Sequence, residues 1–288
     1  MKLDFKDWPG AKQAFLTIRL TTQLPLRQHG FAMQVESKFY QRLHNNDAGY
    51  GRNAYDVPRL MAAPAFHRWL QRSNKSQFRI LDIGCGKGQF LFDLTESLRH
   101  QQQAGYTRIA VVDLIRMEGT LLERISPKPE FFQQSVDGQK LPFADASFDF
   151  VSCNHVLEHI FETEKFLREI RRVTQPGGLV VISVPNTAAW MSRLAFLFAG
   201  TPLGSEVGTE SVTYGFWPGF LQDRLKRFEP SGHIRDFTPR SLHDLTAACG
   251  FKPAGWWAQN GGLFPTLKRN IGILLELQPD AVSSSVQS

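Results

Sequence analysis

The chain has 288 residues, of which 42% are hydrophobic and 21% are charged. This length and composition exclude a wholly disordered chain and suit one α/β domain with an added segment. The formal net charge of +6 is compatible with anionic partners, but a charge this modest does not by itself predict them.

The cysteines and the apolar stretches bear on the cellular compartment. Cys85, Cys153 and Cys249 are far apart and form no C-x-x-C pair, which favours a reducing compartment and predicts no metal site. The N-terminus lacks the apolar run of a signal peptide. The most apolar stretches, 194–199 and 271–277, are far shorter than the roughly 20 residues of a membrane helix. We therefore expect a soluble cytoplasmic protein.

The pattern of elements divides the chain into three parts. Residues 1–77 precede the first clear strand and are predicted to form an N-terminal helical cap, with a helix over 58–72 that breaks at Pro64. Residues 78–278 form the main domain, interrupted by an insertion at 187–232. Residues 279–288 are Ser-rich and predicted to be disordered.

The main domain is organised around residues 79–90, which read as a buried strand, a glycine turn and the start of a helix. Glycines 84, 86 and 88 permit tight backbone angles and close approach of a ligand to the main chain. A dinucleotide-binding fingerprint would need G-x-G-x-x-G. Gln89 stands where its third glycine should be, which disfavours that interpretation. An ordinary corner between a strand and a helix is the other alternative.

The same turn resembles the first motif of class I S-adenosylmethionine-dependent methyltransferases, in particular the bacterial small-molecule methyltransferases. In that motif an acidic residue and one further residue precede G-x-G-x-G, and four residues match it: Asp82, Gly84, Gly86 and Gly88. The resemblance implies that this turn, with Cys85 inside it, packs against the methionine and ribose parts of the cofactor. It also implies that Asp82 helps to hold the methionine ammonium group.

Two further aspartates match the same family. Asp113 ends a predicted strand over 108–114, and the resemblance implies that it binds both ribose hydroxyls, with Leu114 beside the cofactor. A helix N-cap is the alternative for Asp113. Asp137 and Gly138 follow a predicted strand over 130–136 and precede Leu-Pro-Phe and Ser-Phe-Asp signatures. The resemblance implies that Asp137 accepts a hydrogen bond from the adenine amino group, which is a donor and needs an acceptor. The Asp-Gly pair alone would indicate only a turn.

The candidate catalytic residues are histidines. A predicted strand over 148–154 ends in Asn154, and His155 follows it at the position that borders the transferable methyl group in the family. His155 could act as a base because its pKa lies near neutrality, and His233 is the second candidate. His233 belongs to segment 232–242, which resembles a returning segment of these methyltransferases. Packing and hydrogen bonding at a helix start is the alternative for His155.

The remaining pattern completes the predicted fold. Helices are expected over 164–173 and after Thr238, the latter burying Leu242, Leu245 and Ala248, with strands over 179–184, 251–258 and 270–277. The resemblance implies a Rossmann-like sheet of seven mostly parallel strands with helices on both faces and an antiparallel last strand.

The insertion at 187–232 holds an apolar segment at 190–198, a Gly-rich loop and the aromatic residues Phe216, Trp217 and Phe220. These features suit a lid over the acceptor, an anchored loop or a contact with a membrane surface. We expect a methyltransferase acting on a hydrophobic or aromatic small molecule. Lys and Arg are dispersed, which disfavours nucleic acid. An RNA methyltransferase and a non-catalytic cofactor-binding protein are the alternatives.

Overall fold

The computed structural model describes residues 56–277 apart from 74, 101–104, 118, 203, 209, 217, 226–229 and 259–266. Most of the predicted N-terminal cap, Trp217 and the predicted tail therefore lie outside the described residues. No helix among the described residues is long and apolar enough to cross a membrane.

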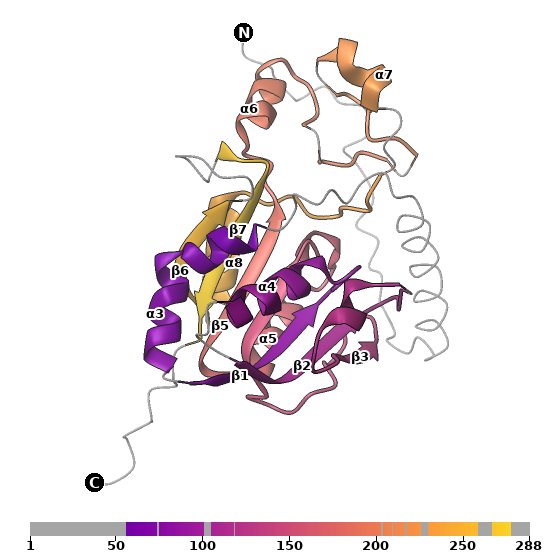
Figure 1. Cartoon of the computed structure of the whole chain (residues 1–288). Coiled ribbons are helices and arrows are strands. Elements are labelled where there is room, and N and C mark those ends of the chain that lie inside the picture. The colour runs from indigo at the N-terminus through magenta and orange to yellow at the C-terminus, as the bar shows by residue number, and fades with distance from the viewer. Residues whose placement is uncertain are drawn as a thin grey trace, which may run out of the picture.

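Within the described ranges, seven strands form one sheet in the order β3-β2-β1-β4-β5-β7-β6 (Figure 1). The strands are β1 (Gln77–Ile83), β2 (Gly105–Asp113), β3 (Glu130–Gln133), β4 (Phe148–Asn154), β5 (Thr174–Pro185), β6 (Lys252–Ala258) and β7 (Asn270–Glu276). β1 to β5 pair in parallel, whereas β7 pairs antiparallel with both β5 and β6. The predicted fold, including the reversed seventh strand, is confirmed.

β1 lies between β2 and β4, so the direction in which the chain builds the sheet changes at β1. At such a switch the connections after neighbouring strands leave on opposite faces, and a crevice opens at the carboxyl ends of the strands. The glycine turn after β1 lies at this point.

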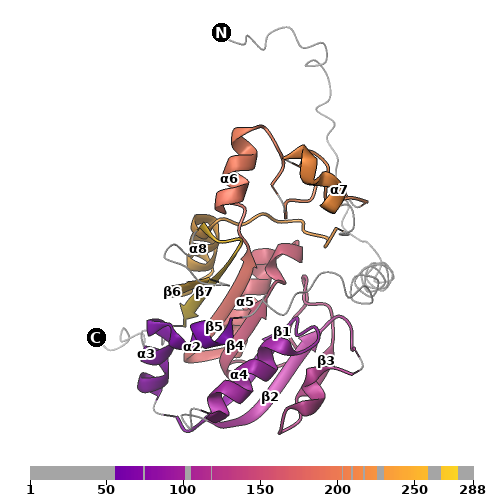
Figure 2. The ribbon, with the colours of Figure 1, turned by 45° about the horizontal axis from the view of Figure 1, so that its top comes forward.

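Helices cover both faces of the sheet (Figures 1 and 2). They are α2 (Val57–Ala62), α3 (Pro64–Ser73) and α4 (Gln89–His100) on one face, and α5 (Thr163–Val173) and α8 (Pro239–Ala248) on the other. Because side chains alternate along a strand, Ile80 packs with the first group of helices and Leu81 with the second. Burial on both faces explains why the central strands read as continuous apolar runs.

The N-terminal helix breaks as predicted. α2 ends at Ala62 and α3 begins at Pro64, where a proline fits the first helical position but would have interrupted a longer helix. Phe66 and Trp69 of α3 are buried, and the Trp69 ring packs at a tilt against Phe78 with ring centroids 4.8 Å apart.

β5 is longer than predicted. The predicted strand covers 179–184, but β5 begins at Thr174 and includes the Pro-Gly-Gly segment at 176–178. The Gly177 N–H donates to the Leu277 carbonyl, and the Leu277 N–H donates to the Gly178 carbonyl. Pairing across the sheet therefore outweighs the local turn preference of these residues.

α8 begins as predicted, with Thr238 as N-cap and Pro239 in the first turn. The predicted buried face is wrong in one position, because Ala248 is exposed and Thr246 is fully buried. The Thr246 hydroxyl donates within the helix, to the carbonyls of Leu242 and His243 at 2.8 and 3.0 Å. A threonine satisfied in this way can occupy an apolar face.

The insertion carries α6 (Trp190–Leu197), the 3-10 turn η4 (Gly219–Leu221) and the short helix α7 (Gln222–Leu225). α6 and α7 lie beside each other in both ribbon views, beyond the carboxyl end of β5 (Figures 1 and 2). Two further 3-10 turns, η2 (Leu121–Arg124) and η3 (Leu157–His159), follow β2 and β4.

Candidate active site

The glycine turn after β1 needs its glycines for two different reasons. Gly84, Gly86 and Gly88 all have positive φ values of 71°, 51° and 79°, where L side chains are strained. A Cβ at Gly88 would lie 2.6 Å from Leu122 Cδ2, so packing also excludes a side chain there. A Cβ at Gly86 would meet nothing closer than the Met117 methyl group at 4.0 Å. The turn is therefore closed on its helix side and open beside Gly86.

Asp113, at the end of β2, is joined directly to this turn. Its Oδ2 accepts from the Gly86 N–H at 2.9 Å, and its Oδ1 accepts from the Ile115 N–H at 3.1 Å. Each carboxylate oxygen has a second lone pair, so this arrangement still leaves acceptor capacity for other donors. The structure thus brings together two of the predicted cofactor residues, which lie 27 positions apart.

Asp82 belongs to β1, two residues before the first glycine of the turn, and is only 2% exposed where β1 pairs with β4. Its Oδ1 accepts from the Ser152 hydroxyl at 2.6 Å. Burial raises the pKa of Asp82 to about 7, although the Ser152 hydrogen bond acts in the opposite direction. A carboxyl group in this condition gains from a nearby cation, because the cation would stabilise its charged form.

Asp137 has a structural role that the sequence analysis did not predict. Its two oxygens accept from the backbone N–H groups of Phe161 and Glu162 at 3.1 and 3.0 Å. These groups lie at the start of α5, whose N-cap residue makes no side-chain cap of its own. Asp137 therefore satisfies helix-terminal donors from outside the helix. Gly138 beside it has φ of 66°.

The end of β4 is strained and buried. His155 is not a glycine but has φ of 55°, a conformation that typically costs about 1–3 kcal/mol and is frequent at functional sites. The Asn154 Oδ1 accepts from the Ser183 hydroxyl at 2.8 Å. The Asn154 Nδ2 is buried and has no hydrogen-bond partner among the described residues.

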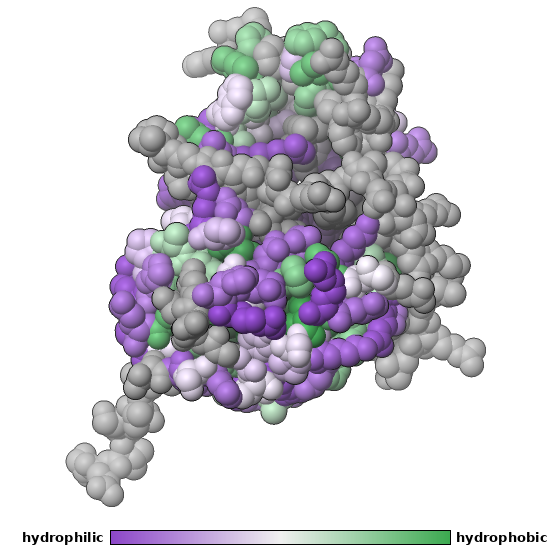
Figure 3. All heavy atoms as spheres, in the orientation of Figure 1, coloured by the Kyte–Doolittle hydropathy of each residue, from purple (hydrophilic) through white to green (hydrophobic). Residues whose placement is uncertain are grey.

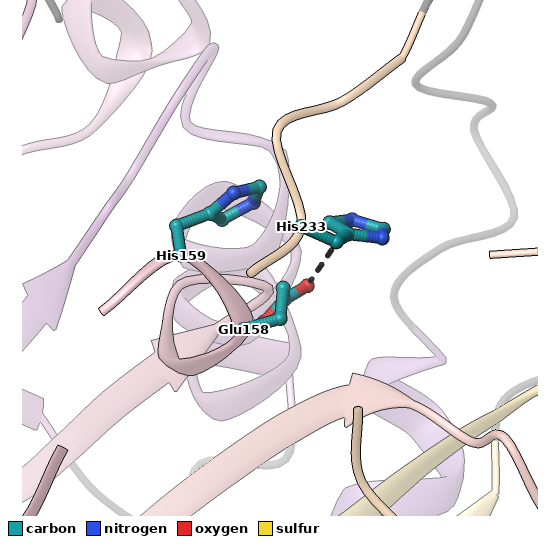
Figure 4. Close-up of side chains that lie close together, drawn as sticks. All are labelled: Glu158, His159 and His233. Carbon is teal, nitrogen blue, oxygen red and sulfur yellow. Dashed lines mark ion pairs between the residues drawn. The ribbon is translucent and has the colours of Figure 1, made fainter. Parts of the chain in front are cut away.

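The two candidate catalytic histidines converge on Glu158, which the sequence analysis did not select. The His155 Nδ1 lies 3.1 Å from Glu158 Oε1. The His233 Nε2 lies 4.0 Å from the same oxygen (Figure 4). Glu158 is 1% exposed. Burial alone would raise the pKa of Glu158, but the hydrogen bond with His155 and the nearby histidines outweigh it and hold the pKa below its usual value. Glu158 is therefore a buried carboxylate in its charged form.

His233 is positioned by a second acidic residue. The Glu206 carboxylate accepts from three consecutive backbone N–H groups, those of Ser231, Gly232 and His233, at 2.5, 2.7 and 3.1 Å. The Glu206 side chain thereby joins the early insertion to the segment that carries His233. No local signal in the sequence indicates Glu206.

The insertion exposes a group of large apolar side chains, which we call the apolar patch: Trp190, Met191, Phe196, Leu197, Phe198 and Phe220. Leu197 is 75% and Phe220 is 81% exposed. Figure 3 shows hydrophobic residues gathered over α6 and α7. Phe216, by contrast, is buried, and next to it the Gly215 carbonyl accepts from the Thr201 N–H at 2.6 Å.

A family model described as a methyltransferase domain matches residues 39–254, which is most of the chain. The chain therefore belongs to this methyltransferase-domain family, within the class I S-adenosylmethionine-dependent methyltransferases. The resemblance seen in the glycine turn and the following aspartates is confirmed at the level of the family.

Two curated relatives illustrate the similarity. Demethylmenaquinone methyltransferase of Beutenbergia cavernae is 27% identical over 183 residues, covering 62% of this chain and 65% of the relative. Ubiquinone/menaquinone biosynthesis C-methyltransferase UbiE of Brucella anthropi is 25% identical over 166 residues, covering 52% of this chain and 60% of the relative. The matches thus span less than two thirds of the length of either relative.

Solved structures share the fold. The 1,6-didemethyltoxoflavin-N1-methyltransferase of Burkholderia thailandensis, solved with S-adenosylhomocysteine, has a TM-score of 0.52 and 17% identity, covering 89% of this chain and 93% of that chain. The 4+2 cyclase SpnF has a TM-score of 0.50 and 14% identity, covering 88% and 96%. At these identities the similarity shows the fold alone.

Proposed function

We propose that this protein transfers the methyl group of S-adenosylmethionine to a small molecule with an apolar, ring-containing body. The observation that carries the cofactor assignment is the hydrogen bond from the Gly86 N–H to Asp113, at the switch in strand order. The turn is open beside Gly86, which suits a ligand that lies directly against the main chain.

Four of the predicted cofactor residues have specific roles in this proposal. The Asp113 carboxylate accepts hydrogen bonds from the two ribose hydroxyls through the lone pairs that are not used by the N–H groups of Gly86 and Ile115. The Asp137 carboxylate accepts a hydrogen bond from the adenine amino group, also through lone pairs that its backbone contacts leave free. Asp82 attracts the methionine ammonium group. The Nδ2 of Asn154, buried and without a hydrogen-bond partner among the described residues, would donate to an oxygen of the ligand in this proposal. Cys85, Leu114 and Gly138 lie next to these residues in sequence.

Bound S-adenosylmethionine supplies a sulfonium methyl group that is already activated for displacement. The protein's main task is then to hold the acceptor atom in line with that methyl at a contact distance of about 3 Å. A base is needed only where the acceptor must lose a proton. His155 and His233 are the candidate bases, and either would have the Glu158 carboxylate to stabilise the cation that it becomes.

The apolar patch supports the proposed character of the acceptor. It belongs to the insertion at 187–232, which leaves the sheet after β5, next in the sheet to the strand that ends in Asn154. Two of the curated relatives are named for quinone chemistry, which fits an apolar ring. We further propose that the insertion closes over the acceptor. The alternative is that the apolar patch contacts a membrane surface in which the acceptor is dissolved.

Calorimetry and methyl transfer test this proposal together. S-adenosylhomocysteine should bind the purified protein with micromolar affinity, and NAD should not bind. Labelled methyl groups should pass to a short-chain demethylmenaquinol and not to total tRNA. Label in tRNA alone would favour the RNA alternative. Tight cofactor binding without transfer to any compound of a metabolite extract would favour a non-catalytic, cofactor-binding role, because a fold alone does not fix the chemistry.

Hydrogen exchange tests the closing movement. Backbone amides of residues 200–219 should exchange quickly in the free protein and become protected when S-adenosylhomocysteine and an apolar acceptor are bound. Equal protection in both states would identify a rigid insert. Protection by phospholipid vesicles alone would assign the patch to a membrane surface.

A further inference from the structure

The side chains of Glu158, His159 and His233 form a compact cluster at the carboxyl end of β4 (Figure 4). One ligand atom from each lies within 4.8 Å of the others. Glu158 and His159 belong to η3, whereas His233 comes from the segment after the insertion. The sequence analysis predicted no metal site, and these residues do not form a metal-binding motif along the chain.

The tautomers of both histidines suit metal binding. The Nδ1 of His159 lies 3.0 Å from the Gly232 carbonyl, and the Nδ1 of His233 lies 2.9 Å from the Gly204 carbonyl. A carbonyl oxygen only accepts, so each Nδ1 carries the hydrogen, and in the neutral ring Nε2 carries the lone pair. Histidines that bind a metal through one ring nitrogen commonly donate a hydrogen bond from the N–H of the other.

The third member, Glu158, has one carboxylate oxygen in contact with a histidine and one without a partner among the described residues. Glu158 Oε1 is the atom nearest to His155 and His233, but Oε2 is buried and has no hydrogen-bond partner among the described residues. Leaving a buried carboxylate oxygen unpaired is costly. A cation could bind there without displacing the contact between Oε1 and His155.

The cluster is not needed to hold its two segments together. The backbone N–H groups of Ile234 and Arg235 already donate to the Glu158 carbonyl at 2.9 and 3.1 Å. Glu206 fixes the backbone around His233 independently. The convergence of two imidazoles on a buried carboxylate therefore calls for a chemical reason.

We propose that Glu158, His159 and His233 bind a divalent transition-metal ion, and that the ion is Zn²⁺ or one of similar ligand preference. Two imidazoles and one carboxylate are a ligand set that zinc uses when a fourth position stays open. Mg²⁺ prefers oxygen ligands, so it fits this set poorly. In a tetrahedral site two ligand atoms are about 3.4 Å apart, so the cluster must contract by about 1.4 Å at most, which side-chain rotation can supply.

Binding of this ion needs neither the proposed cofactor nor the proposed acceptor. It does change the role of one predicted residue. A metal on His233 occupies the lone pair that a base would use, so His233 becomes a ligand and His155 remains as the candidate base.

Calorimetry on the untagged, full-length protein after dialysis against a chelator tests the proposal. ZnCl₂ should bind with one equivalent and a Kd in the micromolar range or below, and MgCl₂ at the same concentrations should give no binding heat. His233→Ala and His159→Ala should each weaken zinc binding at least tenfold. His243→Ala is the matched control, because His243 is exposed and lies on α8 away from the cluster, and its zinc affinity should be unchanged.

A second measurement separates loss of the site from loss of the fold. Saturating ZnCl₂ should raise the Tm of the wild-type protein and of His243→Ala, but not the Tm of His233→Ala, which should still show a cooperative transition. Glu158→Gln should behave like His233→Ala. Absence of zinc binding by the wild-type protein would overturn the proposal. Unchanged zinc affinity in both His233→Ala and His159→Ala would also overturn it, because the ion would then bind elsewhere.

Discussion

The carboxyl ends of β1 and β2 differ sharply from those of β4 and β5. At β1 and β2, the glycine turn and Asp113 are held by short backbone hydrogen bonds, and the neighbouring side chains are packed. Beyond β4 and β5, a strained His155 precedes a cluster with an unpaired carboxylate oxygen, and the insertion exposes large apolar side chains. The hydrogen-bonding groups of the first region are largely paired within the protein, whereas the second region leaves polar and apolar groups without partners among the described residues. This difference is consistent with our proposal of a fixed cofactor site beside a variable acceptor site.

The largest loss of stability is expected from a substitution in the glycine turn after β1. Gly88→Ala combines a positive φ with a Cβ 2.6 Å from Leu122 Cδ2. The backbone strain and the overlap together should lower the free energy of unfolding by about 2–5 kcal/mol in urea denaturation. Gly177→Ala is the control, since Gly177 has φ of 78° but nothing lies within 4 Å of its Cβ position. It should lose only about 1–2 kcal/mol. Equal losses in both variants would show that packing against Leu122 is unimportant.

Removing the carboxylate at the edge of the same region should affect ligand binding more than folding. Asp113→Ala should lose about 2–4 kcal/mol of S-adenosylhomocysteine binding, or roughly 30-fold to several hundredfold in Kd, because charge-assisted hydrogen bonds are lost. Calorimetry measures this change directly. Asp244→Ala is the control, because Asp244 is an exposed aspartate on α8. An unchanged Kd for Asp113→Ala would assign the ribose to other residues.

Asp82 should make stability depend on pH. Its pKa is raised to about 7 in the folded protein from an ordinary value of 3.8, so the folded state retains the proton that the unfolded state has lost. Its contribution to the free energy of unfolding therefore falls as pH rises from about 4 to about 7, then levels off. Between pH 5.5 and 7.5 the decrease should be about 1–2 kcal/mol.

The urea midpoint of Asp82→Asn isolates this contribution, because asparagine does not titrate. The wild-type protein should lose more stability than Asp82→Asn over this pH range. Identical pH profiles would mean that Asp82 is ionised throughout. Groups whose pKa is lowered by salt bridges and hydrogen bonds, such as Asp149 and Glu169, gain their stabilising effect at lower pH and should leave the comparison unaffected.

The smallest effect on stability should come from the apolar patch. Replacing Phe196 and Leu197 together by serine should change the free energy of unfolding by no more than about 0.5 kcal/mol, because both side chains are exposed. The KM for an apolar acceptor should nevertheless rise by roughly tenfold, since contact area is lost. Val207→Ser, at a position that is 69% exposed but outside the patch, should leave KM unchanged. A similar KM in the wild-type protein, the double variant and Val207→Ser would show that the apolar patch does not contribute to acceptor binding.

Sequence reasoning succeeded where the relevant residues form short patterns. The glycine turn, Asp113 and the parallel strands follow from local periodicity and from family motifs, and the break at Pro64 follows from proline geometry. It failed where the local structure depends on contacts between segments that are far apart in the sequence. Pairing with β7 drew the Pro-Gly-Gly segment into β5, and Glu158 meets His233 only because the chain returns after a long insertion. The contacts that the family motifs assign to Asp113 and the glycine turn with a cofactor stay predictions.

Asp137 shows a different limit. Its motif fits an adenine contact, and a turn was the sequence alternative, but the structure adds a third role at the start of α5. That role depends on residues 161 and 162 approaching from beyond the next strand. A pattern within 137–149 contains no information about that approach, so only the folded chain could reveal it.

The hydrogen bonds of Asp113 also have a kinetic consequence. Because Gly86 and Ile115 already hold both carboxylate oxygens, the rotamer of this side chain is fixed before any ligand arrives. A preordered acceptor loses little conformational entropy on binding, and no slow rearrangement needs to precede the encounter. Association at this part of the site should therefore follow a single exponential whose rate increases linearly with ligand concentration.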